Sequence, residues 1–206
     1  LKVDFTKDAC NRLQQRFNAD VTAIEEDMKG CVWIATNKGQ VWRSTSTVLS
    51  ENTSFVPWTK GIKVNENYRI YKDRNGCLWL GDEHAGVLYI DPVTEKVESY
   101  KLAPAGRTNF SASIRQFCLD SRNRLWIATA EGLILFDSKG NTSRLVQLED
   151  KGVKVKDVRA VAEDKEGNIW VGTNLGLKRI DVQGTDITLF GNYERVECIA
   201  GKFYLC

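Results

Sequence analysis

The feature that most constrains the fold is a motif that occurs four times, in which an Asp stands six residues before a Trp. The four segments are DMKGCVWIATNKG from Asp27, DRNGCLWLGDEHAG from Asp73, DSRNRLWIATAEG from Asp120 and DKEGNIWVGTNLG from Asp164. Their Trp residues (Trp33, Trp79, Trp126 and Trp170) are spaced 46, 47 and 44 residues apart. A period in the forties that contains several short strands is typical of propeller blades. The repeat therefore predicts an all-β fold, a β-propeller of four-stranded antiparallel blades.

The unit around Trp170 shows how one repeat builds a blade. VRAVAED, starting at Val158, alternates apolar and polar residues as a strand does, and DKEG has the Asp and Gly of a type I turn. NIWVGT predicts a second strand, a short turn closes on Gly176, and LKRID and DITLF predict the third and fourth strands. The equivalent turn glycines are Gly39, Gly86 and Gly132. Each repeat is thus an antiparallel meander.

The recurring Asp and Trp residues are interpreted as scaffold. An Asp at the same place in every hairpin forms the turn, and a Trp in the second strand fills the space between neighbouring sheets. Because one four-stranded sheet cannot bury both faces, neighbouring blades must stack. We therefore expect no catalytic residues in either set.

The repeat register divides the chain into one propeller region over 1–206. The expected blade pieces are about 1–20, 21–66, 67–112, 113–157, 158–195 and 196–206, which makes four full blades and a fifth divided between the termini. We expect a piece of a longer array. The alternative is a five-bladed ring closed by pairing of the two ends.

Composition excludes several classes of function. The 29 basic and 27 acidic residues are interspersed, and a net charge of +2 does not suggest a nucleic-acid partner. The six cysteines lack zinc-ligand spacing and predict buried or half-buried free thiols. The single histidine has no second ligand beside it, so we expect neither a metal site nor a cofactor. No apolar run is long enough to span a membrane.

Residues 78–100, LWLGDEHAGVLYIDPVTEKVESY, closely resemble the two-component regulator propeller repeat. NIWVGTNLGLKRID and RLWIATAEGLILFD match the centre of that pattern equally well. The resemblance is strong over 27–190 and weak at both ends. The first repeat departs from it at Ser44, where the pattern has Asp, and the second has Asp82 in place of Thr beside an extra residue.

The resemblance implies the extracytoplasmic sensor part of a hybrid two-component histidine kinase and response regulator, as in Bacteroidetes. It implies a piece of a seven-bladed propeller in the periplasm, joined to the inner membrane only through other parts of the parent protein. The implied partners are an oligosaccharide or other small ligand and the other blades or domains of the parent sensor. Exposed sheet edges also make a homo-oligomer an open alternative.

Candidate ligand-binding residues lie where the repeats differ. In a propeller, the first strands line the central channel, and the loops before them share a face with the loops after the second strands. We expect the site on that face. The first strands supply Thr22, Tyr68, Arg69, Arg115, Gln116, Arg159 and Glu197, and the loops supply Asn37, Lys38, Asp82, Glu83, His84, Ala130, Glu131, Asn174 and Leu175. The arginines suit uronate or sulfate groups, whereas a solvated channel wall is the alternative.

Two other functions stay open. A propeller lyase or glycan-active enzyme would need a His base with an acidic or metal partner on the channel face. With His84 as the only His, we expect a domain that is not an enzyme. A protein-interaction scaffold would instead need an apolar or strongly charged patch.

Overall fold

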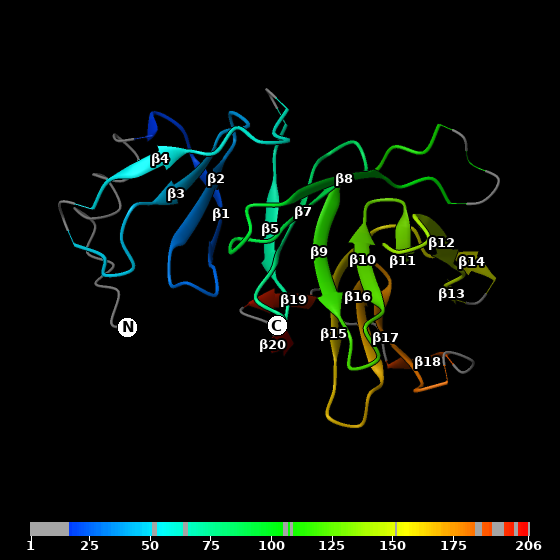
Figure 1. Cartoon of the computed structure of the whole chain (residues 1–206). Helices are drawn as coiled ribbons and strands as arrows, with labels where there is room; N and C mark the ends of the chain where they lie inside the picture. The colour runs from blue at the N-terminus through cyan, green and yellow to red at the C-terminus, as the bar shows by residue number, and fades with distance from the viewer. Residues whose placement is uncertain are drawn as a thin grey trace. The chain divides into compact units, whose positions relative to one another are not determined.

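The alternating residues of each repeat form strands in the computed structural model of this chain. The structure describes residues 17–50, 53–63, 66–104, 107, 109–150, 152–183, 187–190, 196–199 and 202–205. Within these ranges, four sheets contain four strands each, and in every one the spatial order follows the chain order (Figure 1). In the first, third and fourth sheets, every pair of neighbouring strands is antiparallel. The expected all-β propeller architecture of four-stranded meanders is confirmed.

In each of the first two sheets, the second strand begins two residues after the glycine of the predicted Asp–Gly turn. The first sheet contains β1 (Val21–Glu26), β2 (Val32–Thr36), β3 (Val41–Ser44) and β4 (Phe55–Pro57). The second contains β5 (Arg69–Lys72), β6 (Leu78–Gly81), β7 (Gly86–Ile90) and β8 (Val97–Lys101).

The third and fourth sheets repeat this plan. The third contains β9 (Ile114–Leu119), β10 (Leu125–Thr129), β11 (Gly132–Asp137) and β12 (Thr142–Val146). The fourth contains β15 (Val158–Glu163), β16 (Ile169–Thr173), β17 (Gly176–Ile180) and β18 (Ile187–Phe190). Between them lies a small hairpin of β13 (Glu149–Asp150) and β14 (Val153–Lys154).

A final hairpin of β19 (Val196–Ile199) and β20 (Lys202–Leu205) follows the fourth sheet. Strand β19 contacts β15, and β15 in turn contacts β9, so the first strands of successive repeats are neighbours. Strands β1 and β5 are related in the same way. The predicted N-terminal blade piece, about 1–20, lies almost entirely outside the described residues. The blade boundaries, the number of blades and the closure of a ring stay predictions.

The chain divides into two compact units. The first comprises Leu1–Leu80 with Leu88–Glu98, and the second comprises Gly81–Val87 with Ser99–Cys206. The second sheet contributes residues to both units. Each unit has an apolar core built from residues of neighbouring repeats, as stacking of two-faced sheets requires.

The core of the first unit is centred on the wholly buried Trp33. It includes Ala35 and Val41 from the first sheet and Leu78 and Leu80 from β6. Trp58, in the segment after β4, packs its ring 4.8 Å from that of Trp33. Trp33 therefore packs between the first and second sheets, as predicted.

The core of the second unit joins the third and fourth sheets. It contains the buried Trp126 and Leu133 with Val158, Val161 and Val171. Leu148 and Val155, which flank the β13–β14 hairpin, are also buried in it, and the N–H of Val155 donates to the carbonyl of Leu148 at 2.8 Å. The hairpin is thereby fixed at both ends.

Three cysteines fall within the described side chains. Cys77 is buried, whereas Cys31 and Cys118 are half-buried, and all three are free thiols. This agrees with the prediction made for them. The cysteines at positions 10, 198 and 206 lie outside the described side chains.

Candidate functional site

Each Asp of the repeat closes its turn and also binds the Trp six residues later. The carbonyl of the Asp accepts from the residue three positions on, as in a β-turn, for example from Gly30 to Asp27 at 3.0 Å. The residue that donates is left-handed in every repeat: Gly30, Gly76, Asn123 and Gly167 have φ between 60° and 85°. The predicted turns, including the substitution by Asn123, are confirmed.

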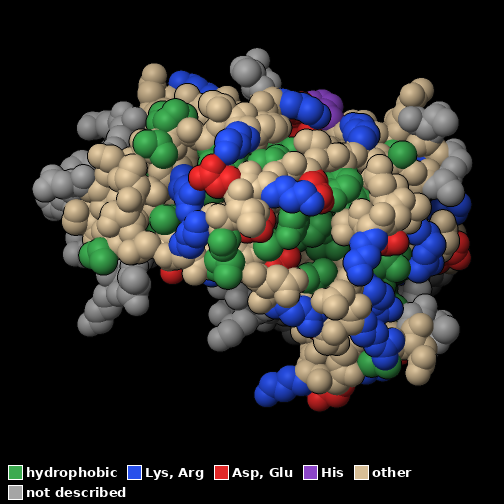
Figure 2. Space-filling view, viewed as in Figure 1, with side chains coloured by type: hydrophobic (Ala, Val, Ile, Leu, Met, Phe, Trp, Pro, Cys, Tyr) green, Lys and Arg blue, Asp and Glu red, His purple; other side chains and the backbone are tan. Residues whose placement is uncertain are grey.

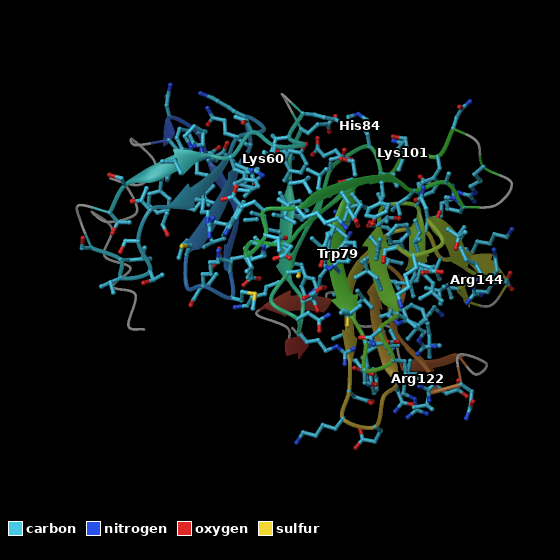
Figure 3. All side chains as sticks on the ribbon, viewed as in Figure 1. Lys60, Trp79, His84, Lys101, Arg122 and Arg144 are labelled. Carbon is cyan, nitrogen blue, oxygen red and sulfur yellow. The ribbon has the colours of Figure 1, made fainter. Side chains whose placement is uncertain are left out.

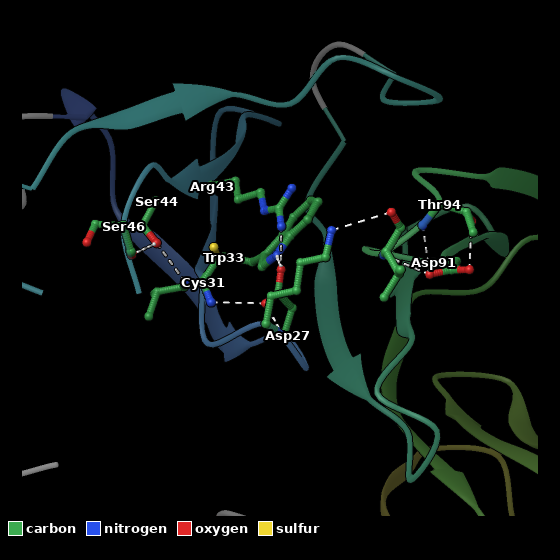
Figure 4. Close-up of polar contacts among 11 residues, drawn as sticks. Asp27, Cys31, Trp33, Arg43, Ser44, Ser46, Asp91 and Thr94 are labelled. Carbon is green, nitrogen blue, oxygen red and sulfur yellow. Dashed lines mark hydrogen bonds and ion pairs between the residues drawn. The ribbon is translucent and has the colours of Figure 1, made fainter. Parts of the chain in front are cut away.

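The Asp side chain makes three further hydrogen bonds that the turn prediction did not include. Its Oδ1 accepts from the backbone N–H groups two and four residues on, as in the bonds from Lys29 (2.9 Å) and Cys31 (3.0 Å) to Asp27 (Figure 4). Its Oδ2 accepts from the indole Nε1–H of the Trp at 2.7 to 2.9 Å in all four repeats. We call this arrangement the Asp–Trp clamp.

The group that completes the clamp differs from repeat to repeat. Arg43, from β3, lies 3.0 Å from the Asp27 carboxylate, and Arg124 lies 2.6 Å from that of Asp120. In the fourth repeat, the Asn168 amide donates to Asp164. The clamps therefore satisfy their carboxylates by different means: an arginine pairs with the buried Asp27 and Asp120, and a neutral amide binds the half-buried Asp164.

Two clamp carboxyls have altered acidity. Burial raises the pKa of Asp120, but the hydrogen bonds from Trp126 and Arg124 outweigh it, so this pKa lies below its usual range. Burial likewise opposes the hydrogen bonds from Asn168 and Trp170 at Asp164, whose pKa is also lowered. Both groups are thus held ionised and are unsuited to proton transfer near neutral pH.

The second repeat uses a thiol and a phenol beside its clamp. The Tyr89 hydroxyl donates to Cys77 Sγ at 3.0 Å, and its ring lies 4.9 Å from that of Trp79, which Figure 3 labels. Burial raises the pKa of the Cys77 thiol, and burial with the bond to Cys77 raises that of Tyr89. A thiol with a raised pKa is a poor nucleophile at neutral pH.

The turn after β6 carries two exposed candidates, Glu83 and His84. The buried carboxylate of Asp82 accepts from the backbone N–H groups of His84 (2.9 Å) and Gly86 (2.5 Å). In the other three repeats, a glycine (Gly39, Gly132 or Gly176) has the positive φ of this turn. In the second repeat, which has one extra residue, Ala85 has the positive φ instead (63°). Lys101 donates to the His84 carbonyl, and the imidazole lies at the surface (Figure 2).

Asn37 and Lys38 hold the segment that leads into β1. The Asn37 amide donates to the carboxylate of Asp20 at 2.9 Å, while its Oδ1 accepts from the Asp20 N–H at 3.1 Å. Lys38 Nζ donates to the carbonyl of Asn18. Both predicted residues therefore have structural contacts in addition to any role in binding.

Tyr68 lies in the core of the first unit and does not form part of an exposed wall. Its side chain is 2% exposed and packs with Trp33 and Leu78, and its hydroxyl accepts from the N–H of Lys63 at 2.9 Å. The bulky apolar ring is what places it there. Its neighbour Arg69 is exposed and donates to the carbonyl of Thr22 at 2.7 Å.

The second unit brings Arg115 and Arg159 together on one carboxylate. Arg115, in β9, lies 2.9 Å from Asp157, and Arg159, in β15, lies 3.1 Å from it. Gln116 accepts from the N–H of Val161 at 2.9 Å and so joins the same two strands. Asn174 is exposed and donates its N–H to the Asp157 carbonyl at 3.1 Å.

Asp157 was not among the predicted site residues, although the sequence contains a signal for it. It stands 17 residues before Asn174, as Asp20 stands 17 residues before Asn37. In both cases, the Asn N–H donates to the Asp carbonyl. An Asp directly before the first strand, paired with an Asn directly after the second, would have identified this position.

A second group of charges continues from Asp157. Lys156 lies 3.5 Å and Arg107 lies 4.0 Å from the carboxylate of Glu131, which was a predicted loop residue. We call Arg107, Arg115, Glu131, Lys156, Asp157 and Arg159 the charged rim. Glu197 lies outside the described side chains.

Two general features of the described residues bear on function. No group of three His, Cys, Asp or Glu residues there has the geometry to hold a metal ion. None of the helices in that part of the chain is long and apolar enough to cross a membrane.

The model of a family described as two-component regulator propeller matches the chain in four segments. These are residues 15–38, 61–84, 110–131 and 152–175. Each segment spans the first and second strands of one sheet with the turn between them, so the matches recur at the period of the clamp.

Among the proteins similar to the chain are two solved structures and one curated protein. The extracellular domain of a protein described as a hybrid two-component system from B. thetaiotaomicron is 19% identical with a TM-score of 0.70, over 91% of this chain and 28% of that one. Virginiamycin B lyase from Staphylococcus aureus is 17% identical with a TM-score of 0.63, over 84% and 56%. Both likenesses show the fold alone.

The curated protein is histidine kinase P4 from Formosa agariphila. It is 26% identical, and the similarity covers 71% of this chain and 14% of that protein. The chain thus spans about a seventh of the length of the curated relative that it matches.

Proposed function

Since the chain belongs to the two-component regulator propeller family, we propose that it is the ligand-sensing part of an extracytoplasmic sensor in a hybrid two-component system. The similarity to histidine kinase P4 and to extracellular domains from B. thetaiotaomicron supports this context. In this proposal, the parent is an inner-membrane protein with a periplasmic sensor of seven-bladed propellers. Its ligand is an oligosaccharide.

The observation that supports sensing is how the repeats divide between constant and variable positions. The clamp keeps the same geometry in all four repeats. The turns after the second strands and the starts of the first strands instead carry different polar side chains. Exposed examples are Glu83, His84, Arg115, Arg159 and Asn174. Variable polar groups on a rigid scaffold are the usual basis of ligand recognition.

We further propose that the domain has no catalytic activity of its own. The clamp carboxylates are occupied by their Trp partners, and His84 lies in an exposed turn whose backbone is fixed by Asp82. The lyase of similar fold makes an enzyme the alternative outcome of the test.

The test is a panel of neutral and acidic oligosaccharides added to the purified chain, followed by both thermal unfolding and product analysis. A sensed ligand should raise the unfolding temperature, because a ligand at one hundred times its Kd stabilises by about 2.7 kcal/mol. The sugar should be recovered uncleaved. Stabilisation by no sugar would contradict oligosaccharide sensing. Cleavage that His84→Ala abolishes would establish an enzyme instead.

A further inference from the structure

The two arginines of the charged rim occupy a special backbone position. The register of β9 against β10 shifts between Ile114 and Gln116, so that Arg115 is an extra residue without a partner in the ladder. The register of β15 against β16 shifts in the same way around Arg159. Such β-bulges redirect a side chain away from the regular faces of a sheet and are frequent beside binding sites.

The same position in the first sheet shows that the bulge belongs to the scaffold while its side chain does not. The shift in β1 lies between Val21 and Ala23, which makes Thr22 the extra residue. Thr22 donates to the carbonyl of Tyr68 at 3.4 Å and carries no charge. Of these three sheets, only the third and the fourth have a cationic side chain at the bulge.

The carboxylate of Asp157 is too small a partner for both guanidinium groups. One of its oxygens faces Arg115 and the other faces Arg159, so each arginine, which has five N–H donors, uses few of them here. The side chains of Arg115 and Arg159 are 41% and 49% exposed, against 26% for Asp157. The arginines thus retain accessible donors, whereas the acid is the more enclosed group.

The surrounding charges leave the rim positive. Lys156 and Arg107 share the single carboxylate of Glu131. The rim as a whole therefore has four cationic and two anionic side chains. Its electrostatic field favours an added anion.

We propose that the charged rim binds one anionic group of a ligand, a carboxylate or a sulfate, between Arg115 and Arg159. Asp157 acts as a positioning residue that holds both guanidinium groups and as the internal counter-ion with which the ligand competes. Planar guanidinium groups bind such anions through paired hydrogen bonds. This inference rests on the proposed sensing function and specifies it to acidic oligosaccharides.

The experiment titrates the chain with sodium sulfate and with sodium glucuronate by calorimetry, at an ionic strength held constant with sodium chloride. Glucose serves as the uncharged probe. Arg115→Gln and Arg159→Gln should each weaken anion binding about tenfold or more, because a hydrogen bond to a charged group is lost. Arg144→Gln is the matched control, since this exposed arginine of β12 lies outside the rim (Figure 3).

The Asp157→Asn variant tests whether the Asp157 carboxylate competes with the bound anion for the two arginines. It keeps the size of the side chain and removes the competing charge, so anion binding should tighten by about fivefold, the effect of one unit charge roughly 4 Å away in water. Weaker binding would contradict the counter-ion role. Equal losses in Arg144→Gln and Arg115→Gln, or no binding of either anion, would overturn the proposal.

These measurements distinguish a failure of the proposed anion site from a failure of the proposed oligosaccharide sensing. Stabilisation by neutral oligosaccharides alone would retain the sensor and remove the anion site. Binding of sulfate or glucuronate that depends on Arg115 and Arg159, without stabilisation by any oligosaccharide, would retain the site and remove oligosaccharide sensing. A preference between the two anions identifies which group the ligand carries.

Discussion

The indole N–H of Trp126 donates to Oδ2 of Asp120 at 2.8 Å, inside a turn where that carboxylate is wholly buried. Arg124 also contacts this oxygen, at 2.6 Å, and its guanidinium lies 5.2 Å from the centre of the Trp126 ring. The Asp120 side chain thus binds both Trp126 of the second strand and the guanidinium of Arg124.

Trp126→Phe should lower the free energy of unfolding by about 1–3 kcal/mol, because it keeps an aromatic ring but removes a donor from a buried carboxylate. Urea unfolding followed by circular dichroism measures the change. Trp58→Phe is the control, since the indole of Trp58 donates to the carbonyl of Lys60 at the surface. An equal loss in both variants would show that the clamp contributes no more than an exposed hydrogen bond.

The lowered pKa values of Asp120 and Asp164 predict a loss of stability in acid. Because each carboxyl is more acidic in the folded chain, its contribution is complete above the unfolded pKa of about 4 and disappears as pH falls through the folded pKa. Urea midpoints between pH 7 and pH 3 should therefore fall most steeply below about pH 4.

Asp120→Asn tests whether this acid sensitivity comes from the clamp. The variant should be less stable at pH 7 and should lose less stability between pH 5 and pH 3 than the wild type. Asp137→Asn, at an exposed position, should keep the wild-type slope. A slope that Asp120→Asn leaves unchanged would assign the acid sensitivity to other groups.

Gly81→Ala should destabilise the second unit by about 1–3 kcal/mol through overpacking. A Cβ at this position would lie 2.4 Å from Cγ2 of Ile114 and 2.7 Å from Cζ of Phe117. Thermal unfolding measures the effect. Gly140→Ala is the control, because the nearest atom to its added Cβ is a carboxylate oxygen of the exposed Asp137 at 3.0 Å.

The combination of Gly81→Ala with Ile114→Ala examines the same contact directly. Residues that clash give non-additive effects, so the double variant should be less destabilised than the two single variants together. Additive losses would mean that the added methyl group is accommodated by a shift elsewhere.

Lys178→Met should loosen the β13–β14 hairpin. Lys178 is 1% exposed, and its Nζ donates to the carbonyl of Glu149 at 2.9 Å. Met preserves most of the apolar stem but leaves this carbonyl without that donor. Hydrogen exchange at the hairpin amides should accelerate more than exchange in β10. A uniform acceleration would indicate global destabilisation instead.

The period of the repeat was sufficient to predict the fold, because turn chemistry and strand alternation are local properties. Asp27 and Gly30 specify a turn whatever surrounds them. The hydrogen bond between Asp27 and Trp33 was not predicted, since it depends on the three-dimensional return of the second strand over the turn.

The candidate site was harder to predict because aligned positions do not share an environment. Tyr68 aligns with Arg115 and Arg159, yet its ring is buried against Trp33 whereas the arginines are half exposed. The 17-residue spacing to Asn174 marks Asp157 in the sequence, but only the structure shows that two arginines from different repeats share its carboxylate. Such pairings depend on the stacking of sheets and have no fixed spacing in the sequence.

The bulges in β1, β9 and β15 have a consequence for how such a chain can change. Thr22, Arg115 and Arg159 stand outside the ladder pairing, so exchanging their side chains alters no strand partner. Duplicating a repeat therefore copies the strand pairing together with one position that is free to diversify. Selectivity can then evolve one blade at a time, without renewed selection for folding.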